Sequence, residues 1–149
     1  MPYLYGERCP GWNDARKASF HDVKPAHTLA DFYRAVQMGV LFNMYQCYEI
    51  MCENTGEPQE IIVSGGVTLS EAWLHMLADL FGRTMSISAD QDSSSIGAVS
   101  VGLRAVGVTD ALALGGGSAG ARRNIEPDAD SRPLMLDRYA RFLELYRKN

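Results

Sequence analysis

The stretch 61–82, IIVSGGVTLSEAWLHMLADLFG, constrains the fold more than any other part of the chain. It begins with a short β-branched apolar run, which is typical of a strand covered on both faces. Gly65 and Gly66 follow, and glycine lets a backbone turn with positive φ while leaving no side chain above the turn. Ser70 is a favourable N-cap for a helix with apolar residues at helical spacing, and Gly82 is a typical C′ residue. The stretch therefore predicts a buried strand, a bare glycine turn and an amphipathic helix.

This strand–turn–helix unit allows two interpretations. A bare turn at a helix N-terminus is a favourable seat for a nucleotide. A Gly-Gly pair also joins strands to helices in many α/β proteins for packing alone. The pattern is neither GxGxxG nor GxxxxGKS/T, and no lysine stands beside the glycines to hold a β- or γ-phosphate. If a nucleotide binds here, we therefore expect the glycines to lie under its adenosine end rather than to grip its phosphates.

Composition argues against several classes of function. The 149 residues carry a net charge of −4 with a pI near 5.3, so no general attraction to nucleic acid or to an anionic membrane is expected. No apolar run reaches membrane-spanning length. The three cysteines lack CxxC spacing and the three histidines lie far apart, which argues against a metal site and a disulfide framework. Free thiols suit a reducing compartment, so we expect a cytoplasmic domain.

Outside the central stretch, the pattern predicts three further helices and one further strand. The helices span 28–53, about 96–106 and 139–148, and the strand lies within 83–88. Alternating helices and strands imply an α/β fold with a mainly parallel sheet flanked by helices. Two strands are too few for a stable sheet, so we expect the missing strands to lie upstream of this chain. The open edge should then stay exposed or pair with another molecule, a homodimer included.

Four local features carry expectations of their own. Gly39 inside the first helix predicts the close approach of another element. The small residues of the helix at 96–106 predict close packing on a sheet or helix. The loop 6–10, GERCP, carries adjacent opposite charges. It is either a surface turn with a local ion pair or a structured loop that packs on a neighbouring domain or a substrate cleft. The triple glycine within 113–130 indicates a flexible connection rather than a phosphate loop.

Several segments, in this order, resemble the C-terminal domain of the FGGY family of carbohydrate kinases. They cover the chain from Pro2 to about Asp110, and the terminal helix also fits. The matched segments are PYLYGERCP at 2–10 for the family's PxLxGERxP, RAVQMGV at 34–40 for RAxxEGV, SGGVTLS at 64–70 with Trp73 and ADL at 78–80 for the adenosine segment GGGxxSxxWxQxxAD, and SSSIGA at 93–98 for SSALGAA. Within the family, the segments Trp12-Asn13, Ser19-Phe20 and Asn43-Met44-Tyr45 are most similar to gluconate kinases, with xylulose kinases next.

The resemblance implies an actin-like, ribonuclease-H-like fold of two domains, with ATP in the cleft between them and the sugar held mainly by the N-terminal domain. Gly65, Gly66 and Ser70 match family positions near the adenosine of ATP, and Thr68 is a weaker match. The catalytic aspartate and the phosphate-binding DxGT-type turn would lie upstream. We therefore expect no catalytic residue and no metal ligand in this chain, although the whole enzyme would use ATP and Mg²⁺.

These expectations divide the chain and define its role. Residues 1–112 would be part of the ATP-side kinase domain, 113–136 a glycine-rich connection, and 137–149 a terminal helix packed on that domain. The expected function is the C-terminal part of a kinase that transfers the γ-phosphoryl group of ATP to a hydroxyl of a sugar or sugar acid, gluconate first and xylulose second. This part would be inactive without the N-terminal kinase domain. The alternative is a non-catalytic, nucleotide- or partner-binding fragment of a decayed kinase, since Met38 replaces the family's usual glutamate and Val67 replaces its third glycine.

Overall fold

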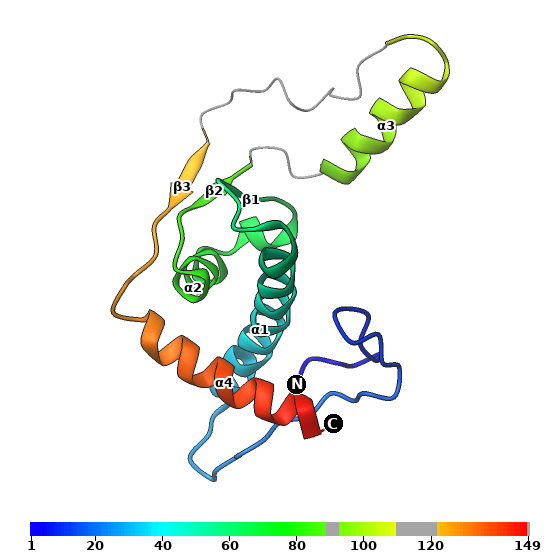
Figure 1. Cartoon of the computed structure of the whole chain (residues 1–149). Coiled ribbons are helices and arrows are strands. Elements are labelled where there is room, and N and C mark those ends of the chain that lie inside the picture. The colour runs from blue at the N-terminus through cyan, green and yellow to red at the C-terminus, as the bar shows by residue number, and fades with distance from the viewer. Residues whose placement is uncertain (89–92, 110–121, 149) are drawn as a thin grey trace. The chain divides into compact units, whose positions relative to one another are not determined.

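The computed structural model describes residues 1–88, 93–109 and 122–148 (Figure 1). The triple glycine, expected to be a flexible connection, lies outside the described residues. The elements in chain order are α1 (Leu29–Thr55), β1 (Ile61–Val63), the 3-10 helix η1 (Gly66–Leu69), α2 (Glu71–Phe81), β2 (Met85–Ile87), α3 (Ser93–Ala105), β3 (Arg123–Ile125) and α4 (Arg132–Lys148).

The chain forms two compact units. Unit 1 consists of Met1–Gln59, Asp79–Gly82 and Pro127–Asn149, so it contains α1, the last turn of α2 and α4. Unit 2 consists of Glu60–Ala78 and Arg83–Glu126, so it contains the sheet, the glycine turn and α3. None of the helices in the described residues is both long and apolar enough to cross a membrane.

Helix α1 has the start that the sequence predicts. The Asp31 carboxylate accepts hydrogen bonds from the backbone N–H and from the hydroxyl of Thr28, each at 2.7 Å. These two bonds lower the pKa of Asp31, the backbone bond most. The helix ends at Gly56, whose φ is +79°. Gly39 is buried, and a Cβ atom there would lie 3.7 Å from the Pro2 ring, which confirms the predicted close approach of another segment.

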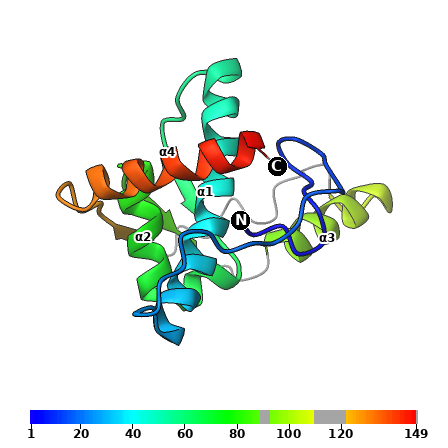
Figure 2. The same ribbon diagram turned by 90° about the horizontal axis from the view of Figure 1, so that it is seen from below.

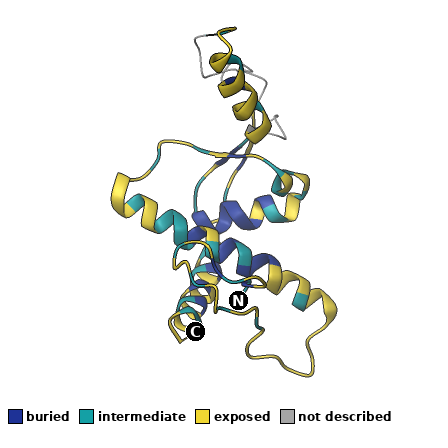
Figure 3. Cartoon of the chain, turned by 90° about the vertical axis from the view of Figure 1, so that its right-hand side faces the viewer, coloured by how far each residue is buried: buried dark blue, intermediate teal, exposed yellow. Residues whose placement is uncertain are grey.

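Aromatic side chains from α1 and α4 form the core of unit 1. Helix α4 crosses α1 (Figure 2), and burial is concentrated in the middle of α1 while both of its ends are exposed (Figure 3). Phe42 lies 5.8 Å from Tyr139 and 5.7 Å from Phe142, measured between ring centroids. Tyr45 makes an edge-on contact with Tyr139 at 5.0 Å. Rings at these separations add specific attraction to the area that they bury.

Helix α4 begins earlier than the sequence pattern indicates. It starts at Arg132, with Pro133 in its first turn, where the missing N–H of proline leaves no helical hydrogen bond unmade. The Met135 N–H donates to the Ser131 carbonyl at 3.2 Å, and the Ser131 hydroxyl donates to Asp128 at 2.7 Å. The helix predicted at 139–148 therefore starts about two turns too late, and the expected boundary at 137 lies within α4.

Unit 2 contains a small mixed sheet in the order β1-β2-β3. β1 and β2 are parallel, with Ile61 opposite Met85, as the α/β expectation requires. β2 and β3 are antiparallel, with Met85 opposite Ile125, and β3 was not predicted. Met85 and Ile125 are buried, as is Leu74 of α2. The α/β class is confirmed, and β1 ends the sheet as an edge strand within the described residues.

Helix α3 differs from the expectation drawn from its small residues. A Cβ atom at Gly97 or at Gly102 would meet no atom within 4 Å, and Val99 and Val101 are exposed. Within the described residues, no element therefore packs closely on these glycines. Small residues make the surface of α3 suited to close packing, but they do not determine which element packs against it.

Candidate nucleotide-binding site

The turn after β1 has a backbone that requires glycine at one position. Gly65 has φ +82° and ψ −163°, a combination that is essentially restricted to glycine. Gly66 begins η1 without a positive φ, so Gly65 alone of the pair supplies the left-handed turn. A Cβ atom at either position would meet no atom within 4 Å. The surface above this turn is therefore bare and open.

The polar residues that follow close the turn. The Thr68 hydroxyl donates to the Gly65 carbonyl at 2.7 Å, and the Thr68 N–H donates to the same oxygen at 3.0 Å. Thr68 thus fixes the conformation of the turn, because its hydroxyl proton is used within it. The Ser70 N–H donates to Val67 at 3.2 Å, and the Ser70 carbonyl accepts the Leu74 N–H at 3.0 Å, which places Ser70 at the N-cap position of α2.

The turn lies at the edge of the sheet where parallel strands end. β1 and β2 run in the same direction, and the Ser88 N–H donates to the Val63 carbonyl at 2.9 Å, just beyond their paired residues. In α/β proteins, ligands bind outside the carboxyl ends of parallel strands. Such an edge, just before the N-terminus of α2, therefore brings together the predicted site residues Gly65, Gly66, Thr68 and Ser70.

Two exposed ion pairs hold β3 beside this region, and the sequence reasoning did not find them. The Arg123 guanidinium donates to both carboxylate oxygens of Glu71, the first residue of α2, which lowers the pKa of Glu71. Arg122 donates to both oxygens of Glu60 at 2.9 and 3.0 Å. The Arg123 contact is bidentate, with two nitrogens on two oxygens, whereas a single Arg122 nitrogen reaches both oxygens of Glu60. The two pairs connect β3 and the residue before it to the start of α2 and to the residue before β1. No local pattern could have indicated them, because each partner pair is more than fifty residues apart.

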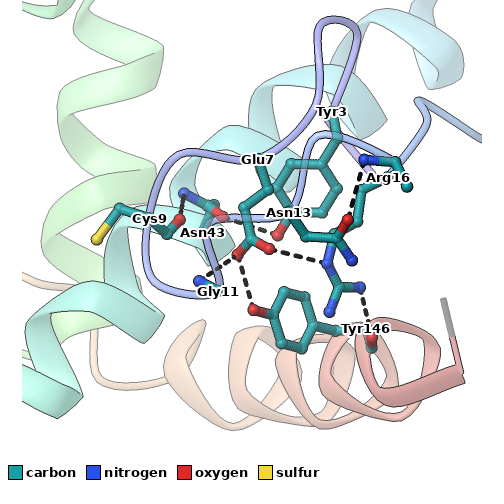
Figure 4. Close-up of polar contacts among 9 residues, drawn as sticks. Tyr3, Glu7, Cys9, Gly11, Asn13, Arg16, Asn43 and Tyr146 are labelled. Carbon is teal, nitrogen blue, oxygen red and sulfur yellow. Dashed lines mark hydrogen bonds and ion pairs between the residues drawn. The ribbon is translucent and has the colours of Figure 1, made fainter.

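Unit 1 contains a second polar cluster, in the loop GERCP (Figure 4). The Glu7 side chain is fully buried and lies 2.8 Å from the Arg16 Nε. It also accepts hydrogen bonds from the Gly11 N–H at 3.0 Å and from the Tyr146 hydroxyl at 2.7 Å. Arg16 donates to the Tyr146 carbonyl at 2.6 Å and stacks 3.7 Å from the centroid of its ring. The loop is therefore structured and anchored to α4.

The ion pairs of this loop bear on both of its interpretations. Glu7 pairs with Arg16, while the adjacent Arg8 forms an exposed ion pair with Asp14. The exposed pair agrees with the interpretation as a surface turn with a local ion pair, while the buried pair shows that the loop is also structured. The element against which the loop packs is α4 of the same unit.

A mostly apolar hollow of about 670 Å³ lies elsewhere in unit 1. It is lined by the N-terminal segment, the loop around Phe20, and parts of α1 and α4. None of the predicted site residues contributes to it.

Among the described residues, no group of three or more histidine, cysteine, aspartate or glutamate side chains is arranged to hold a metal ion. The buried Asp79 carboxylate accepts the Asp128 N–H at 2.7 Å, which is a structural role.

Comparisons with known proteins agree with this architecture. The family model of the C-terminal domain of FGGY carbohydrate kinases matches residues 1–106. Gluconokinase from Bacillus subtilis is 34% identical over 112 residues, which cover 74% of this chain and 22% of the relative. The crystal structures of a ligand-bound xylulose kinase and of gluconate kinase from Lactobacillus acidophilus superpose with TM-scores of 0.83 and 0.81, both at 26% identity, and each match covers 99% of this chain and 30% of the other.

The chain therefore belongs to the FGGY family of carbohydrate kinases and corresponds to the C-terminal domain. The predicted family fold is confirmed by the structures with which it superposes. The chain spans about a quarter of the length of the curated relatives it matches.

Proposed function

We propose that this chain is the ATP-side part of a carbohydrate kinase and that the turn from Gly65 to Ser70 seats the adenosine of ATP. The observation that carries the proposal is the bare turn, whose backbone requires glycine at Gly65 and above which a Cβ atom would meet nothing. A flat base or a ribose can approach a backbone closely only where no side chain intervenes. The position of the turn, at the carboxyl edge of parallel strands and before α2, supports the same assignment.

Each residue of the turn has a defined task in this proposal. Gly65 sets the direction of the backbone, and Gly66 leaves the face open to the ligand. Thr68 holds the turn through its bond to the Gly65 carbonyl, so it positions the site rather than contacting the nucleotide. Ser70 presents its side chain at the N-terminus of α2, where the helix dipole favours electronegative groups. When bound, ATP supplies the γ-phosphoryl group and Mg²⁺ neutralises phosphate charge.

For the whole protein we propose phosphoryl transfer to a hydroxyl of gluconate, with xylulose as the second candidate. The names of the relatives support both sugars. The catalytic aspartate and the phosphate-binding turn belong, in this proposal, to the N-terminal kinase domain, so this chain alone is inactive. We keep 1–112 as part of the ATP-side domain. The connection expected at 113–136 shortens in this proposal, because β3 (Arg123–Ile125) pairs with the sheet and the terminal helix starts at Arg132. The free cysteines support a cytoplasmic location.

The second candidate function is a fragment without catalytic activity, and the departures from the family pattern favour it. Met38 is buried in unit 1, where its thioether lies 3.5 Å from the Arg138 guanidinium, so that departure concerns packing between α1 and α4. Val67 lies within η1, beside the glycines of the proposed seat. Val67 is therefore the departure that bears on nucleotide binding.

A calorimetric titration of the chain with ADP and with Mg-ADP tests the seat. Gly66→Val fills the open face with a side chain that meets no protein atom at its Cβ, so we expect a folded chain whose affinity falls at least tenfold. Gly102→Val in α3 is the matched control, because its Cβ is equally unobstructed, and it should bind as the wild type does. Equal affinity of the wild type and Gly66→Val would place the nucleotide elsewhere. Assays of the full-length protein with gluconate and xylulose then separate a kinase from an inactive fragment.

A further inference from the structure

Two cysteines that are far apart in the sequence meet in unit 1. The Cys47 thiol of α1 points at the sulfur of Cys9 in the N-terminal loop, with 3.3 Å between the two Sγ atoms. Both residues are free thiols; Cys9 is exposed and Cys47 is half-buried. A disulfide requires sulfurs about 2.05 Å apart, so closure shortens this separation by little more than about 1 Å.

Neighbouring hydrogen bonds hold the two thiols together. Asn43 lies four residues before Cys47 and therefore faces the same side of α1. Its side-chain amide donates to the Cys9 carbonyl at 3.2 Å, while its oxygen accepts the Tyr3 hydroxyl at 2.7 Å (Figure 4). The buried Glu7 anchors the same loop to α4. The meeting of the thiols is therefore built into the fold of the loop.

We propose that Cys9 and Cys47 form a reversible modification site, a dithiol that peroxide oxidises to an intramolecular disulfide. The Cys9 sulfur attacks one peroxide oxygen, the O–O bond breaks, and a sulfenic acid and one water form. The Cys47 sulfur then attacks the Cys9 sulfur and loses its proton, and the S–O bond breaks to release a second water. In sum, two thiols and one hydrogen peroxide give a disulfide and two waters. Thiol–disulfide exchange with a dithiol reductant restores the original state.

The environment assigns different tasks to the two sulfurs. Burial, with the hydrogen bond to Cys9 adding to it, raises the pKa of Cys47 to about 11, so this residue stays a thiol at neutral pH. Cys9 is exposed and is therefore the sulfur that an oxidant reaches first. Cys47 acts second, as the resolving thiol. The bond would close a loop between residues 38 positions apart in the sequence and tether the GERCP loop to α1.

Peptide mapping of the unmodified sequence tests the proposal without depending on the folding of any variant. The reduced chain is treated with equimolar hydrogen peroxide, blocked with N-ethylmaleimide and digested. We expect a cross-linked peptide that joins Cys9 to Cys47, blocked Cys52, and full recovery of thiols with dithiothreitol. The closed form should also unfold at a midpoint roughly 5 °C or more above the reduced form, since the cross-link constrains the unfolded chain.

Three variants provide the controls. Cys9→Ser and Cys47→Ser should each abolish the cross-linked peptide and the shift in midpoint. Cys52→Ser is the matched control, because Cys52 is a half-buried thiol on the same helix, and it should cross-link as the wild type does. Oxidation spread evenly over all three cysteines would overturn the proposal. Covalent dimers linked through Cys52, or oxidation of Cys9 beyond the sulfenic acid with Cys47 intact, would overturn it as well.

Discussion

Replacing Arg16 by methionine removes the counter-charge of a carboxylate that has no contact with solvent. The Glu7 side chain is 0% exposed and the Arg16 side chain 11% exposed, so the pair lies in a medium of low dielectric constant. Loss of one partner from a buried pair costs about 3–5 kcal/mol, because the other charge stays buried and uncompensated. Glu7 keeps the donors of Gly11 and Tyr146 in the variant. We therefore expect the lower end of this range, about 3 kcal/mol of the free energy of unfolding.

The matched control is Arg8→Met in the same loop. Arg8 pairs with Asp14, but their side chains are 61% and 76% exposed, and an exposed pair contributes about 1 kcal/mol or less. Urea denaturation followed by far-ultraviolet circular dichroism measures the free energy of unfolding of both variants. The comparison is valid if the slope of this free energy against urea concentration is the same as in the wild type. Adding Glu7→Gln to Arg16→Met should restore part of the loss, since a neutral amide needs no counter-charge. The reasoning is refuted if Arg16→Met costs no more than Arg8→Met.

Three further predictions follow from backbone and charge. Gly65→Ala should cost about 1–3 kcal/mol because φ is +82°, whereas Gly66→Ala should change stability by less than about 0.5 kcal/mol; equal losses in urea denaturation would contradict this. Gly39→Ala should stabilise α1 by up to about 1 kcal/mol, since the Pro2 ring at 3.7 Å leaves room for a methyl group, and a lower thermal midpoint would count against it. The raised pKa of Cys47 means that the folded chain holds this proton more tightly than the unfolded chain. Stability should therefore be complete below pH 9 and fall as the pH rises towards 11, with a weaker fall in Cys47→Ser; a urea midpoint that stays constant over this range would argue against the assignment.

The local parts of the fold could be predicted because their signals lie within short windows. The run at 61–82 contains a strand, a glycine turn, an N-cap and a C′ glycine in order, and β1, η1 and α2 form there. The sequence predicts a positive φ somewhere in the pair Gly65-Gly66, but it does not indicate that Gly65 is the residue that adopts it. β3 escaped prediction because Arg123–Ile125 has a single apolar residue and no alternation. It is a strand through its pairing with β2 and its ion pairs, which are tertiary contacts.

The polar cluster around Glu7 lay beyond sequence reasoning for the same physical reason. Tyr146 is 139 positions from Glu7, and no spacing rule connects residues so far apart. The motif GERCP drew attention to the loop, but the partners of its two charges, Arg16 and Asp14, lie outside the motif. The three cysteines are free thiols, and their spacing in the sequence does not indicate that any two of them meet. That two of them lie 3.3 Å apart depends on how the loop folds back on α1.

The most direct test of the proposed seat is an amide nitrogen–proton correlation spectrum of the chain during titration with Mg-ADP. The account predicts saturable shifts centred on the amides from Gly65 to Ser70 and on the first turn of α2, and their loss in Gly66→Val. Saturable shifts centred on the apolar hollow or the GERCP loop of unit 1, with the glycine turn unchanged, would contradict it.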